Sequence, residues 1–142
     1  SPLAARVASV LSTGADRPRE TLEAALRSVV AALSDERALS VPMLVIREAP
    51  SAPQIAQIYR DEVLSHVIPA MVGMLETARR AGHIRDIDPE MTVRSVVGPV
   101  LAHILLARVF GIAPEGGLAI DRLIENHLTI LFDGLMPQES RR

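Results

Sequence analysis

The segment from Ser95 to Ala107 is apolar on nearly every side, and it limits the folds open to this chain. Arg94 and Arg108 flank it, so the uncharged run is well short of the roughly 20 residues that a helix needs to cross a bilayer. A helix on the surface of a globular protein keeps one polar face, which this segment lacks. We therefore expect it to be buried on both sides. The chain's own helices cover one side, and a second copy covers the other, so the sequence predicts an obligate homodimer.

The rest of the sequence indicates a single all-α domain spanning residues 1–142. Hydrophobic residues make up 49% of the chain, which is ample for a core, and aromatic residues only 2%, so that core must be aliphatic. No run of alternating polar and apolar residues indicates a strand. Apolar spacing, together with proline, aspartate and glycine signals, predicts about six helices. Their approximate ranges are 3–11, 18–33, 34–49, 53–81, 89–110 and 118–135, with kinks expected at Pro69 and at Gly98–Pro99.

Several functional classes find no support in the sequence. The chain has no cysteine, which excludes disulfides, zinc-thiolate sites and cysteine nucleophiles. Its net charge of −2, without a basic cluster, is unlike the concentrated positive face of a nucleic-acid-binding module. No nucleophile–base pair and no phosphate-binding glycine loop is visible, so we expect neither an enzyme nor a cofactor. Glu62 and His66 are four residues apart, but an exposed ion pair is preferred to a metal site because no third ligand accompanies them.

Tyr59 and His103 are the polar residues best placed to orient a small molecule, although each also has a structural interpretation. Tyr59 either satisfies a buried polar group or presents its hydroxyl to a ligand. For His103, a hydrogen-bonded role at a helix interface is preferred to ligand contact. Met43 and Met71 are expected to fill gaps in the core, and methionines also line adaptable apolar pockets. Arg47 is a weaker candidate that would serve an anionic ligand.

The order of several segments resembles a known family. The chain carries Leu44–Pro50, Pro53–Tyr59, Ala81–Pro89 and Leu131–Leu135, with Gly98 inside the apolar helix. In this order and spacing they resemble the C-terminal ligand-binding and dimerisation domain of the TetR/AcrR family of bacterial transcriptional regulators. The family's N-terminal helix-turn-helix DNA reader is not found, and residues 3–11 look like the tail of the helix that joins reader to body. We therefore expect this chain to be the regulatory body of such a regulator, without its DNA reader.

The resemblance implies two sites. The family's ligand pocket lies inside the body, and here its lining would come from the middle helices, through Leu26, Val30, Met43, Tyr59, Val63, Met71, Val97, Leu101 and His103. The last two long helices of the family pair with their mates as a four-helix bundle. Here the interface residues would be Val96, Val100, Ile104, Leu123, His127, Leu128, Leu131 and Leu135.

The resemblance also implies a function. The chain would be the regulatory body of a cytoplasmic transcriptional regulator of the repressor type, which homodimerises and binds a small apolar effector. It would contact DNA only through an N-terminal domain and would not associate with membranes. The effector would favour one conformation of the body and so change the separation of the two DNA readers. One alternative is a helical dimerisation or interaction module without a functional pocket. A carrier or enzyme for apolar molecules, built on a helical bundle, has less support.

Overall fold

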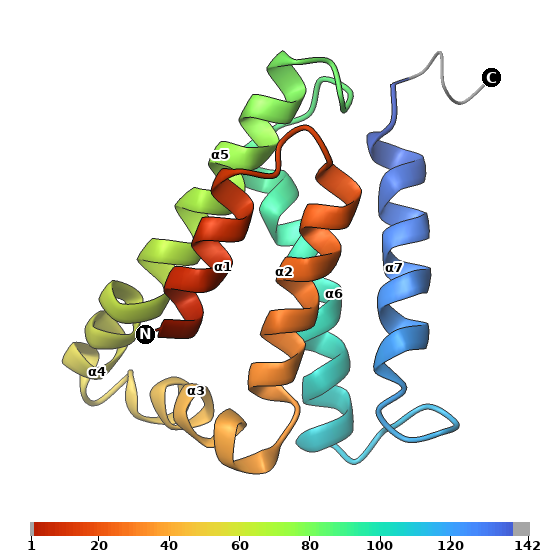
Figure 1. Ribbon diagram of the computed structural model, residues 1–142. Helices are drawn as coiled ribbons and strands as arrows, with labels where there is room; N and C mark the ends of the chain where they lie inside the picture. Colours follow the sequence, from red (N-terminus) through yellow and green to blue (C-terminus); the bar gives the residue numbers. More distant parts are fainter. Residues whose placement is uncertain (1, 138–142) are drawn as a thin grey trace.

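The computed structural model describes residues 2–137 as a bundle of helices, without a strand in that range (Figure 1). The elements are α1 (Pro2–Ser12), α2 (Pro18–Leu33), α3 (Glu36–Glu48), α4 (Pro53–Tyr59), the π-helical turn η1 (Arg60–Leu64), α5 (Ser65–Arg80), α6 (Pro89–Arg108) and α7 (Ile120–Leu135). Because α4, η1 and α5 follow one another without a loop, the bundle has six helical segments. The predicted all-α fold is confirmed.

Helix α2 is the centre of the bundle. It contacts α1, α3, α5, α6 and α7, and its inward stripe of Leu22, Leu26 and Val30 is fully buried. Figure 1 shows α1 lying along α5, and α7 standing beside α2 on the opposite side of the bundle. The buried side chains are almost all aliphatic, as predicted, and Phe132 is the one aromatic residue among them. Tight packing of these branched side chains provides most of the stability.

The helix starts follow the capping signals in the sequence. Asp88 accepts a hydrogen bond from the Met91 backbone N–H at 3.1 Å, and Pro89 occupies the first helical position of α6. Asp35 caps α3 in the same way, by accepting from the Ala38 N–H at 2.7 Å. At the end of α5, Gly82 adopts a φ of 77°, a left-handed conformation that glycine tolerates without strain.

The long helix predicted over residues 53–81 contains an irregularity that the sequence did not reveal. Residues 60–64 widen into a π-helical turn, and the Ser65 N–H bonds to the Arg60 carbonyl. The widened turn lies just before Pro69, whose ring crowds the Ser65 carbonyl four residues earlier. Tyr59 and Val63, both predicted ligand residues, are therefore located beside and within this turn.

The last helix begins at Ile120 rather than Leu118, and α6 ends at Arg108 rather than Phe110. Two features account for the later start. Ala119 adopts a left-handed conformation with φ 48°, and the Leu118 carbonyl lies 2.7 Å from Nε2 of His103. This contact ties the loop after α6 back to the body of that helix.

The residues predicted for the dimer interface pack inside the protomer instead. Val96, Val100, Ile104, His127, Leu128 and Leu135 are buried within the single chain, and Leu123 and Leu131 pack against the same core. Nε2 of His127 lies 2.8 Å from the Val96 carbonyl, which joins α7 to α6. In α6 the predicted residues form the inner stripe. Because this helix is apolar all round, its periodicity did not distinguish the inner side from the outer side.

A cluster of ion pairs fixes the connector between α5 and α6. Arg79 donates to Oε1 of Glu76 at 2.7 Å and to Oδ1 of Asp86, in the connector, at 3.0 Å. Arg80 also donates to Oε1 of Glu76, at 2.9 Å. The hydrogen bond from Arg79 is the main cause that lowers the pKa of the Glu76 carboxyl below its ordinary value of 4.5.

The lowered pKa of Glu76 predicts a pH-dependent contribution to stability. A carboxyl whose pKa falls on folding adds stability above its unfolded pKa and loses it as the pH falls through the folded value. We expect Glu76→Gln to destabilise the protein at pH 7. The difference in unfolding free energy between the two proteins should become smaller below about pH 4.5. Urea unfolding of both proteins between pH 3 and pH 7 measures this difference. A gap between the two proteins that stays constant over that range would contradict the assignment.

Candidate functional site

The predicted ligand residues come from α2 and from elements around it. Leu26, Val30 and Met71 are buried in the core, whereas Met43, Tyr59, Val63, Val97 and His103 are half-buried. Leu101 is 40% exposed, on the flank of α6. The set thus divides into a solid inner part on α2 and α5 and a half-buried, more accessible part on α3, α4, η1 and α6. Within residues 2–137, no group of three His, Asp or Glu side chains is arranged to hold a metal ion.

Tyr59 is the best polar candidate in the accessible part. It is half-buried, and burial raises the pKa of its phenol above the ordinary value of 10.0, so the hydroxyl is neutral at physiological pH. Among residues 2–137, no hydrogen bond joins this hydroxyl to another residue. A neutral phenol donates and accepts equally well. The adjoining π-helical turn adds to its candidacy, because such turns are frequent at functional sites.

The other predicted polar contacts are engaged elsewhere. Nε2 of His103 is bonded to the Leu118 carbonyl, which corresponds to the structural role preferred for this residue from sequence. Arg47 is exposed on α3, where its Nε donates to the Glu48 carboxylate at 3.2 Å. These contacts leave Tyr59 as the candidate for orienting a ligand among the middle helices.

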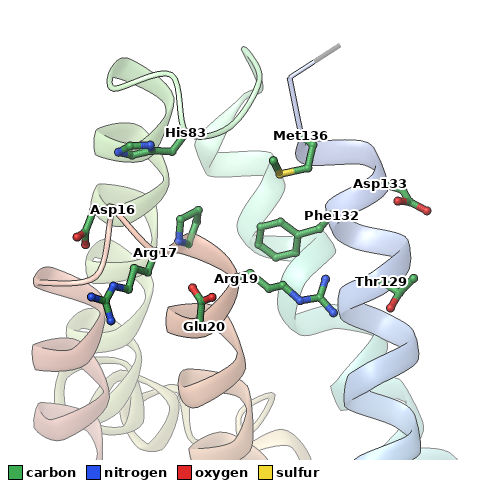
Figure 2. Close-up of a pocket in the computed structure, with 10 residues that line it drawn as sticks. Asp16, Arg17, Arg19, Glu20, His83, Thr129, Phe132, Asp133 and Met136 are labelled. Carbon is green, nitrogen blue, oxygen red and sulfur yellow. The ribbon is translucent and has the colours of Figure 1, made fainter. Parts of the chain in front are cut away.

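A second candidate site, the α2–α7 hollow, lies at the opposite end of α2. It has a volume of about 740 Å³ and is lined by the α1–α2 turn, the first turn of α2, His83 and the last turns of α7 (Figure 2). The guanidinium of Arg19 lies 5.6 Å from the centre of the Phe132 ring, and its Nη1 donates to the Leu128 carbonyl at 3.3 Å. Sequence analysis missed this site, because residues 16–20 indicated only a turn and a helix start.

The comparison with known families decides the class of the molecule. Residues 13–112 match the family described as "Tetracyclin repressor-like, C-terminal domain". The chain belongs to this family. No curated protein and no solved structure gave a significant match. The resemblance found in the sequence is therefore confirmed, and this tetracyclin repressor-like domain is the regulatory part of a transcriptional regulator, a class that is generally non-enzymatic.

One surface of the tetracyclin repressor-like domain is unusually apolar. By length and composition α6 is apolar enough to cross a membrane, although a core helix of a soluble protein passes the same test. Only 22% of the residues in the most apolar 18-residue stretch of α6 are buried within the protomer. We call the outward side of α6 and α7 the outer face, which comprises Met91, Ser95, Ala102 and half-buried Gly98 of α6, Val109 directly after it, and Asn126, Ile130 and Gly134 of α7.

The outer face is open above its glycines as well as apolar. A Cβ atom added at Gly98 or at Gly134 would meet nothing within 4 Å, so no other part of the described chain fills the space above these glycines. Small residues at Ser95, Gly98 and Ala102 let another backbone approach α6 closely. This surface is suited to a helix-to-helix contact with a second protomer.

Proposed function

We propose that this chain is the effector-binding and dimerising body of a repressor-type transcriptional regulator in the cytoplasm. The observation that carries the proposal concerns α6. This helix is apolar on all sides, yet its own protomer buries only 22% of the residues in its most apolar 18-residue stretch. In a tetracyclin repressor-like domain, a second copy packed against the outer face supplies the missing cover. DNA contact would belong to a helix-turn-helix reader outside this chain.

The effector site we propose lies between α2, α3, the α4–η1–α5 segment and α6. Half-buried Met43, Val63 and Val97 favour an apolar molecule, and the unpaired hydroxyl of Tyr59 would orient it. Arg47 would serve an anionic effector only after leaving Glu48. An effector that fits one arrangement of these helices better than another shifts the population of body conformations, and the dimer transmits the shift to its two readers.

The effector proposal predicts a ligand-dependent gain in stability. A compound present at about a hundred times its dissociation constant should raise the free energy of unfolding by roughly 2.7 kcal/mol. A thermal-shift screen of apolar acids, alcohols and amphiphilic drugs measures this gain. We expect Tyr59→Phe to weaken the best hit by roughly three- to tenfold, the loss of one hydrogen bond.

Ile58→Ala serves as the control, because Ile58 adjoins Tyr59 but is 62% exposed. This variant should bind the hit with unchanged affinity. The competing function, a dimerisation module without a pocket, is favoured by the solid packing of Leu26, Val30 and Met71. If no compound raises the melting temperature while the protein remains a dimer, that competing function replaces the one proposed.

A further inference from the structure

The α2–α7 hollow is open to the surface, and the proposed function does not use it. Its volume of about 740 Å³ lies within the roughly 300–1,000 Å³ typical of small-molecule sites. It is also remote from the effector site proposed above. Arg19 is in the first turn of α2, whereas Val30 of the effector site is in its last turn. A ligand here would contact α7 and the turn before α2, and would not contact Tyr59.

Arg19 is held in position at the floor of the hollow. Its guanidinium stacks over Phe132, 5.6 Å from the ring centre, and Nη1 donates to the Leu128 carbonyl. One bond to a carbonyl leaves further N–H donors of the guanidinium available for a ligand. Because these two contacts restrict the side chain, a ligand that binds Arg19 orders little additional chain.

Apolar side chains line the hollow near Arg19. Phe132 projects from α7 toward α2, next to Arg19, and Met136, the residue after α7, lies beyond Phe132 at the end of the hollow where His83 lies (Figure 2). Phe132 is 5% exposed, so its ring is fixed by the core and presents only a small surface to the hollow, whereas Met136 and Pro18 are half-buried and present more. A molecule with a short aryl or alkyl group could lie against these side chains while an acidic group reaches Arg19. Aromatic and aliphatic surface beside a fixed arginine is the arrangement that recognises an amphiphilic anion.

The charged side chains around the hollow are of both signs. Arg17 borders it in addition to Arg19, but Figure 2 shows the Arg17 side chain turned away from Arg19, on the side where Asp16 lies. Three carboxylates border it as well, but Figure 2 shows the Asp133 side chain turned to the outer side of α7, away from Phe132. Asp16 lies on the far side of the α1–α2 turn, which leaves Glu20 as the acid nearest to Arg19. Glu20 repels any anion, and it disfavours ligands with more than one negative charge most strongly.

We propose that the α2–α7 hollow is a second ligand site, which binds a small amphiphilic monocarboxylate. The carboxylate pairs with Arg19, and the apolar group packs on Phe132 and Met136. The site is independent of the effector site near Tyr59 and of the outer face. A ligand bound there would join α2 to α7 and so stabilise the end of the bundle where Arg19 connects them.

Three isosteric probes test the class of ligand: 3-phenylpropanoate, 3-phenylpropanol and 3-phenylpropylamine. Amide chemical shifts of the full 142-residue chain are followed by NMR titration with each probe. We expect the carboxylate to bind most tightly, the alcohol weakly and the amine least. The shifted amides should lie in residues 16–20, around His83 and in residues 128–136. Arg19→Gln should weaken binding of the carboxylate by about tenfold, through loss of a charged hydrogen bond.

Arg27→Gln is the matched control. Arg27 is also an exposed arginine of α2 that bridges to α7, through Asp121 at 2.6 Å, but it lies outside the hollow. This variant should bind the carboxylate like the unaltered chain. The proposal is overturned if the amine binds as tightly as the carboxylate. It is also overturned if both arginine variants lose affinity for the carboxylate equally, or if no amide chemical shifts change. Shifts confined to residues near Tyr59 would support the effector site and overturn this one.

Discussion

Replacing Ile130 by glutamate is expected to convert the proposed dimer into folded monomers. Ile130 is 65% exposed in the protomer and lies on the outer face, which we propose the second copy covers. A carboxylate at this position would be buried without a partner, at a cost of about 3–5 kcal/mol. That cost raises the dissociation constant of the dimer by on the order of a hundredfold or more. Light scattering at micromolar concentration should change from twice the chain mass to the chain mass.

Val41→Glu is the control for this substitution. Val41 is similarly exposed, at 56%, but lies on α3, away from the outer face. This variant should remain a dimer of unchanged stability. Dissociation by both substitutions would point to general destabilisation. An Ile130→Glu protein that stays dimeric would mean that the second copy does not pack on the outer face.

Replacing Gly14 by alanine is expected to destabilise the fold strongly. The new Cβ would lie 2.1 Å from Oγ1 of Thr21 and 2.5 Å from its Cγ2. Thr21 is buried, with 6% of its surface exposed, and its hydroxyl donates to the Gly14 carbonyl at 2.8 Å. The turn at Gly14 must move away from Thr21, and the hydrogen bond between them is lost. We therefore expect about 2–4 kcal/mol of destabilisation. Chemical denaturation measures the loss.

Two further variants separate steric overlap from the loss of a glycine. Thr21→Ala in the Gly14→Ala background removes the two closest atoms and should restore part of the stability, which a double-mutant cycle reports as coupling. Gly73→Ala, in α5 with nothing within 4 Å of the new Cβ, should stabilise the protein by about 0.5–1 kcal/mol. A mild effect of Gly14→Ala would show that the turn before α2 is not tightly packed.

Most of the fold could be predicted because its signals are local. The predicted range 18–33 coincides with α2, since Pro18 starts the helix and the apolar stripe ends at Leu33. Asp88 and Pro89 likewise marked the start of α6. The π-helical turn was missed because nothing in residues 60–64 distinguishes a widened turn from a regular one. The late start of α7 depends on His103, fifteen residues before Leu118, a contact that local patterns do not indicate.

The candidate sites were harder to predict because they depend on which side of a helix faces the core. Val96, Val100 and Ile104 form one apolar stripe of α6, and Met91, Gly98 and Ala102 lie on the opposite side. Hydropathy does not distinguish the two sides of α6. Side-chain size does, because the small residues around Gly98 lie on the outer face. The α2–α7 hollow brings together residues more than a hundred positions apart, so no local pattern indicates it.

Tyr59 has a spectroscopic consequence. The chain has one tyrosine and no tryptophan, so near-ultraviolet emission excited above the phenylalanine band originates at a single side chain. That side chain is half-buried at the junction of α4 and the π-helical turn, where the effector is proposed to bind. The unlabelled protein therefore carries its own fluorophore in the proposed effector site, and a ligand in the α2–α7 hollow would leave its local contacts unchanged. Quenching or a lifetime change on titration distinguishes occupancy of one site from occupancy of the other.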